Sequence, residues 1–95
     1  MEKLLNERMT EVKILKERLN ITKRSIKVNK DLVNNLQKTL DLYRDDWSDV
    51  RLEAAQTMIN KINLSIEKQE QKVQKLKDFI KKKEDIIKFT KYLGD

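Results

Sequence analysis

The sequence predicts an all-α chain that folds into a long, coiled-coil-like antiparallel hairpin of two helices. Three observations predict this fold class. The chain has no proline and one glycine while 40% of its residues are charged, a composition typical of long helices and coiled coils. Apolar residues recur with a heptad period in both halves of the chain. The two heptad patterns differ in phase, and the break between them falls at the Asp-rich segment 45–49.

The first heptad pattern covers the N-terminal half. One row repeats every seven residues without a gap from Leu5 to Trp47, and a second row follows it three residues later. This spacing places both rows on one face of a helix, which we expect to run from about residue 3 to about residue 45. We call this face, with its counterpart on the second helix, the seam. The first helix contributes Leu5, Arg8, Val12, Leu15, Leu19, Thr22, Ile26, Asn29, Val33, Leu36, Leu40, Tyr43 and Trp47.

The second heptad pattern begins after Trp47-Ser48-Asp49. Ser is a preferred residue at helix N-termini, so we expect a turn at about 46–49 and a second helix from about 50 to about 92. The phase shift favours a hairpin over the alternative, one continuous helix with a stutter. The second helix contributes to the seam Leu52, Ala55, Ile59, Ile62, Ile66, Gln69, Val73, Leu76, Ile80, Lys83, Ile87 and Thr90.

Antiparallel pairing about this turn brings two amides of the seam together. Folding the chain at 47–50 places Asn29 near Gln69, among aliphatic neighbours. A polar pair inside an apolar seam fixes register at a cost in stability, so these two residues are the predicted register pair. Farther from the turn, Arg8 faces Thr90, and we expect that end to pack more loosely or to require a partner.

Further apolar residues repeat with the heptad period outside the seam. Two helices cannot bury them as well, and contiguous apolar strips usually mark interaction surfaces. The alternative is ordinary surface exposure, which is common in soluble proteins. We call these residues the outer rows and predict that they form a partner interface. They are Ile14, Ile21, Val28 and Leu42 on the first helix, and Phe79, Ile86 and Leu93 on the second, where Met58 shares the same heptad position.

The second helix is rich in lysine. Between Lys61 and Lys91 there are ten lysines and five acidic residues. A row of lysines attracts phosphate, so a basic coiled-coil protein that binds nucleic acid or an anionic surface is the alternative function. Against it, this segment has no arginine, and its aromatic residues lie on or near apolar rows.

The residue types needed for catalysis are missing. The chain has no cysteine and no histidine, which removes thiolate chemistry and the usual general base. Asp45, Asp46 and Asp49 match no calcium-loop spacing and are explained by the preference of helix N-termini for acidic residues. The sequence therefore predicts a protein that is not an enzyme and holds no cofactor or metal.

The sequence also bears on location. Charged residues interrupt every apolar run of segment 1–7, unlike in a secretory signal, and no stretch approaches the about 20 apolar residues that span a membrane. We expect a cytoplasmic protein without a membrane span, with signal-peptide-independent export beside a partner as the alternative.

The central turn carries a resemblance to a known family. A helical hairpin of about this size with a lone tryptophan in its turn resembles the WXG superfamily of type VII secretion. Trp47-Ser48-Asp49 stands where that family has Trp-x-Gly, so Trp47 matches and Asp49 departs. The family's export signal, an aromatic residue followed four positions later by an acid, does not follow Tyr92. The chain is most similar in character to the small WXG-like accessory proteins of LXG-domain toxins in Gram-positive bacteria.

This resemblance implies a function. Members of that group bind the helical N-terminal LXG domain of a toxin and act as targeting factors or chaperones for its export. From the chain length we expect residues 1–95 to form one hairpin domain. The resemblance implies that this domain assembles with a toxin domain, and that a second small WXG-like protein is a further candidate partner. A hetero-oligomer is the expected assembly and a homodimer the alternative.

Overall fold

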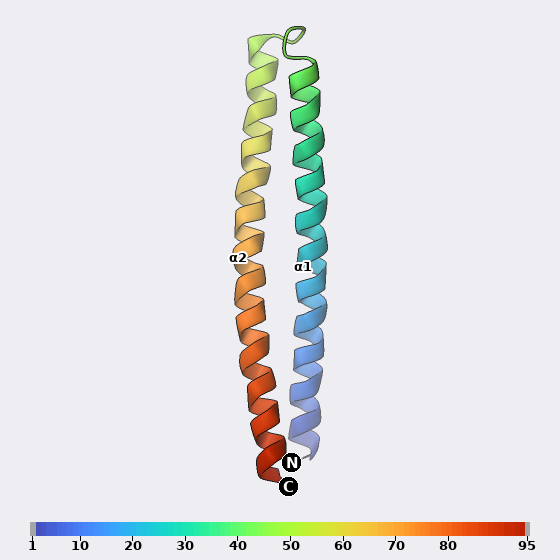
Figure 1. The fold of residues 1–95 in the computed structure, drawn as a ribbon, viewed down its shortest axis with the longest axis vertical. Coiled ribbons are helices and arrows are strands. Elements are labelled where there is room, and N and C mark those ends of the chain that lie inside the picture. Colours follow the sequence, from blue (N-terminus) through green and yellow to red (C-terminus); the bar gives the residue numbers. More distant parts are fainter. Residues whose placement is uncertain (1, 95) are drawn as a thin grey trace. The chain divides into compact units, whose positions relative to one another are not determined.

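A computed structural model of the chain describes residues 2–94, which contain two helices and no strand. Helix α1 spans Glu2–Leu42 and helix α2 spans Asp49–Gly94. The predicted all-α, antiparallel two-helix hairpin is confirmed (Figure 1). Helix α1 ends earlier than predicted, because the chain turns at Tyr43, whose carbonyl accepts hydrogen bonds from the backbone N–H groups of Asp46 and Trp47.

The two helices form two compact units. The first unit combines α1 up to Lys23 with α2 from Gln71 onwards, and the second is the segment Arg24–Glu70, which includes the turn. Within each unit, α1 and α2 run antiparallel and side by side (Figure 1). Each unit therefore has its own stretch of seam.

The second unit contains the predicted register pair. Asn29 Nδ2 donates a hydrogen bond to Gln69 Oε1 over 3.0 Å, and Gln69 Nε2 donates one to Ser25 Oγ over 2.8 Å. The predicted contact is confirmed, and Ser25 is an additional member of the polar layer. Leu40, Ile59 and Ile66 are the buried apolar residues of this unit. The role of the two amides in fixing register stays a prediction.

The first unit is centred on Val12, Ile80 and Ile87. Leu5, Leu15 and Leu19 pack against these three buried residues. All six belong to the predicted seam, so the heptad pattern identifies the core of this unit.

Polar residues complete the seam of the first unit. Thr22 is buried, and its hydroxyl donates to the Arg18 carbonyl of the preceding helical turn. At the predicted contact between Arg8 and Thr90, Arg8 Nη1 donates to Thr90 Oγ1 over 3.1 Å. Each polar group thus has a local partner within the unit.

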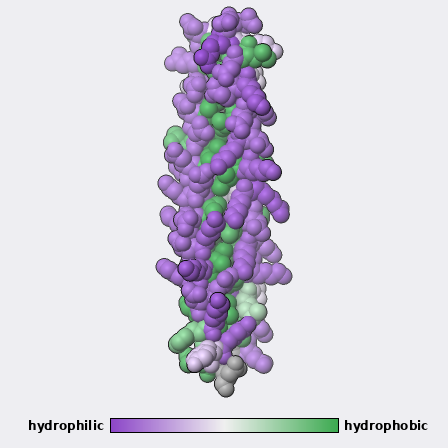
Figure 2. All heavy atoms as spheres, viewed as in Figure 1, coloured by the Kyte–Doolittle hydropathy of each residue, from purple (hydrophilic) through white to green (hydrophobic). Residues whose placement is uncertain are grey.

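The seam is narrow in both units. Figure 2 shows hydrophobic side chains gathered in a strip that hydrophilic side chains border on both sides. No large side chain of residues 2–94 falls below 2% exposure, and Ile59, at 2%, is the least exposed apolar residue. Two helices provide neighbours on one side only, so each seam residue keeps part of its surface in contact with solvent.

Trp47 lies in the turn and is half-buried. Its ring stacks on Tyr43 with a centroid separation of 5.4 Å and an interplanar angle of 4°, and the Arg51 guanidinium lies 4.1 Å from the Trp47 centroid. Ser48 caps α2, since its Oγ accepts a hydrogen bond from the backbone N–H of Arg51 at 3.3 Å. The turn is therefore held by a stack of three side chains and one helix cap.

The prediction that Tyr43 belongs to the seam is wrong. Tyr43 is exposed, because α1 ends at Leu42 and the helical periodicity no longer applies after it. Its ring packs on Trp47 instead. The last seam residue of α1 is Leu40, which is buried.

Replacing Trp47 with Ala removes both ring contacts of the turn. We expect Trp47→Ala to lower the free energy of unfolding by about 1–2 kcal/mol, because an aromatic pair and an exposed cation–π contact each contribute about 0.5–1.5 kcal/mol. Urea denaturation followed by circular dichroism measures this change. Trp47→Phe, which keeps a ring above Tyr43, is the control and should lose less. Equal stability of Trp47→Ala and the unchanged chain would show that the stack contributes nothing.

Candidate partner-binding surface

The residues of the outer rows are exposed on both helices. On α1, Ile21 is 63% exposed, Val28 64% and Leu42 73%, while Ile14 is less exposed. On α2, Met58, Phe79, Ile86 and Leu93 are also exposed. In the first unit these residues come from both helices, whereas Val28, Leu42 and Met58 belong to the second unit. The outer rows thus lie outside the seam in both units, and their role as a partner interface stays a prediction.

In the first unit the two outer rows meet at a groove. Ile14 of α1 and Phe79 of α2 both line it, together with the seam residue Leu15. The polar members of the lining are Glu11, Arg18 and Lys83. Residues of the outer rows from different helices therefore share one apolar groove whose rim is charged.

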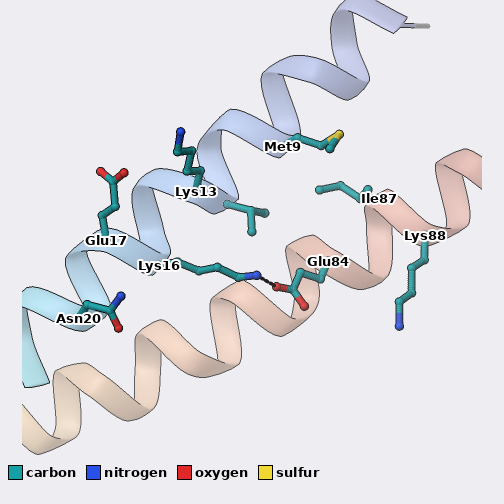
Figure 3. A pocket seen from close by; sticks show the side chains of 9 residues that line it. Met9, Lys13, Lys16, Glu17, Asn20, Glu84, Ile87 and Lys88 are labelled. Atoms are coloured by element: carbon teal, nitrogen blue, oxygen red, sulfur yellow. Dashed lines mark ion pairs between the residues drawn. The ribbon is translucent and has the colours of Figure 1, made fainter.

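A second groove of the first unit involves residues outside the outer rows. It is lined by Met9, Val12, Lys13, Lys16, Glu17, Asn20, Glu84, Ile87 and Lys88. Figure 3 shows Met9 and Ile87 pointing toward each other across it, whereas Lys13 and Glu17 point away from α2. Lys16 and Glu84 form an ion pair of 2.8 Å beside it (Figure 3). Sequence reasoning missed Met9, because a single methionine beside the seam has no heptad partner that would reveal a row.

An ion pair crosses the Ile14–Phe79 groove. Lys83 Nζ lies 2.7 Å from Glu11 Oε2 and 5.3 Å from the centroid of the Phe79 ring. The hydrogen bond and the charge of Lys83 lower the pKa of the Glu11 carboxyl below its ordinary value of 4.5. Glu11 therefore stays ionised and paired, and the seam residue Lys83 reaches the rim of the groove.

The two units differ in charge. The described residues of the first unit include 14 basic and 7 acidic residues, whereas the second unit has 8 of each. The positive charge of the chain is therefore concentrated in the first unit, which also contains the Ile14–Phe79 groove.

Two lysines beside the outer row of α2, Lys75 and Lys82, have no ion-pair partner among residues 2–94. Lys75 and Lys82 lie four residues before and three residues after Phe79, so they border the same face of the helix. The ion pairs between the helices involve Lys16, Lys30 and Lys83 instead. Lys75 and Lys82 are thus available to groups outside the chain.

Two further features, a cluster of metal ligands and a membrane-spanning helix, are absent from the part of the chain that the structure describes. No three potential metal-ligating side chains gather among residues 2–94, the Asp residues of the turn included. Within the same range, neither helix has a stretch apolar enough to cross a membrane.

The comparisons with known proteins find no relative. The chain matches no family model, and no curated protein or solved structure shows significant similarity to it. The resemblance to WXG-like proteins stays a prediction. The position of the family's glycine is occupied by Asp49, the first residue of α2, and no residue other than glycine has a positive φ in the described chain. The turn here therefore needs no left-handed residue at this position.

The Glu11–Lys83 pair predicts a pH dependence. Because Lys83 lowers the pKa of Glu11 in the folded chain, the pair stabilises the fold above about pH 4.5, and this stabilisation is lost as the pH falls through the lowered pKa. An NMR titration of the Glu11 side-chain carboxyl should give a pKa below 4.5, and Lys83→Met should move it back toward that value. An unchanged Glu11 pKa in Lys83→Met would show that the pair does not form in solution.

Proposed function

We propose that this chain is a non-enzymatic helical partner of the N-terminal LXG domain of a type VII secreted toxin, and that it helps to target or chaperone the toxin for export. It would act in the cytoplasm before export, and transport together with the toxin is the alternative. One observation carries the proposal. Ile14 and Phe79, which belong to outer rows on different helices, line one groove and remain exposed.

The groove and the outer rows suit a helical partner. Residues seven positions apart on a helix present one stripe, so Ile14 with Ile21, and Phe79 with Ile86, can receive the side chains of another helix. Burying an apolar side chain of this size contributes about 1.5–3 kcal/mol before the cost of association is subtracted. The residues of the outer rows in the first unit can therefore contribute a large part of the binding free energy that offsets this cost. The LXG domain as partner rests on the resemblance of the Trp47 turn to WXG-like accessory proteins.

A basic coiled-coil protein that binds nucleic acid or an anionic surface is the second candidate. The concentration of positive charge in the first unit supports it. The exposed apolar rows do not follow from it, because phosphate contacts need cations and not aliphatic side chains.

The experiment compares two double variants. Ile14→Glu with Ile21→Glu places two carboxylates in the outer row of α1, and burying them without partners is costly. Asn6→Glu with Asn34→Glu adds the same charge to exposed positions of the same helix on another heptad row. Each is co-expressed with the LXG domain of a toxin encoded beside this chain's gene, and affinity is measured by calorimetry. We expect the first variant to lose at least about a hundredfold in affinity while staying helical, and the control to bind normally.

Two results would contradict the proposal. If the Ile variant binds the LXG domain as tightly as the unchanged chain, the outer rows are not the interface. If no neighbouring LXG domain binds the unchanged chain but DNA or RNA does in a salt-dependent way, the second candidate is correct.

A further inference from the structure

We propose that the Ile14–Phe79 groove binds an acidic amphipathic helix, whose apolar side chains enter the groove and whose carboxylates pair with Lys75 and Lys82. This inference rests on the proposed function, because it specifies the chemistry of the helix that this surface receives. The charged residues around the groove support it.

Only some of the charged side chains that line the groove have an ion-pair partner among the described residues. Glu11 is its only acidic residue, and Lys83 already pairs with it at 2.7 Å. Arg18 lines the groove without an ion-pair partner among the described residues. The lining therefore presents an unpaired cation and no unpaired anion.

Lys75 and Lys82 form a positive edge beside the outer row of α2. Residues three and four apart are neighbours on a helix surface, so Lys82 borders both Phe79 and Ile86, and Lys75 borders Phe79. No acidic residue occupies a position three or four residues from Phe79 or Ile86. A helix lying on Phe79 and Ile86 would thus meet lysines along its outer flank, and Glu or Asp there would pair with them.

The charge argues against other occupants. A second copy of the chain would bring the same surface, and the 14 basic and 7 acidic residues of the first unit would repel their equivalents. Nucleic acid would pair with the lysines but would leave Ile14 and Phe79 in contact with water. An acidic amphipathic helix satisfies both the apolar groove and its positive edge.

The test uses two fluorescently labelled synthetic helical peptides with identical leucine heptads, one with Glu and one with Lys at the flanking positions. Fluorescence anisotropy measures their binding to the full chain. We expect the Glu peptide to bind and the Lys peptide to bind at least tenfold more weakly. Lys75→Gln with Lys82→Gln should weaken binding of the Glu peptide roughly fivefold, because two exposed ion pairs are lost.

Lys77→Gln with Lys81→Gln is the matched control. It removes the same charge from exposed positions in the same part of α2 on other heptad rows, and it should change binding less than twofold. If both double variants lose the same affinity for the Glu peptide, general electrostatic attraction explains the effect and the inference is overturned. Equal binding of both peptides would also overturn it, as would binding to vesicles of anionic phospholipid without binding to the Glu peptide.

The same variants separate this inference from the proposed function. If the Glu peptide binds as expected and no LXG domain does, the proposed function fails and the acidic-helix site stands. If an LXG domain binds and Lys75→Gln with Lys82→Gln changes neither its affinity nor that of the Glu peptide, the proposed function stands and this inference fails.

Discussion

The seam between α1 and α2 is the interaction on which the rest of the structure depends. Each helix has one neighbour, so a single stripe of each can be buried, and even the best-packed residues of the first unit, such as Val12 and Ile80, retain some solvent contact. Any apolar residue outside that stripe must be exposed in the isolated chain. The exposure of Ile14, Ile21 and Phe79 is therefore a geometric consequence of a two-helix fold.

Several positions of the seam are occupied by polar side chains, which form hydrogen bonds or ion pairs where aliphatic side chains would form apolar contacts. The layer of Ser25, Asn29 and Gln69 replaces aliphatic contacts with hydrogen bonds in the second unit. In the first unit, Arg8 and Lys83 occupy seam positions but direct their charged ends to Thr90 and Glu11. Long side chains of this kind bury their aliphatic stems and keep the charge near solvent. The seam is thus less apolar than a self-sufficient core, which favours an additional partner.

The heptad period made most of the fold predictable. Rows of apolar residues identify the buried face of each helix from the sequence alone. The phase shift at the turn sets the register that joins Asn29 to Gln69. The same reasoning failed at Tyr43, since a period holds only while the helix continues. It also missed Met9, whose groove exists because residues near it in space are distant in sequence. The proposed partner could not be read from the heptad pattern, and it rests on the groove chemistry and on the resemblance of the turn around Trp47.

The central claim is that the outer rows are exposed in the isolated chain and are reserved for a partner. Isoleucine δ1-methyl NMR with a soluble paramagnetic agent tests it directly, because the chain has isoleucines in the outer rows and in the seam. We expect strong relaxation of the Ile14, Ile21 and Ile86 methyls and protection of the Ile59 and Ile80 methyls. Protection of all five methyl groups in the isolated chain would contradict it, because the outer rows would then already be covered by another copy of the chain.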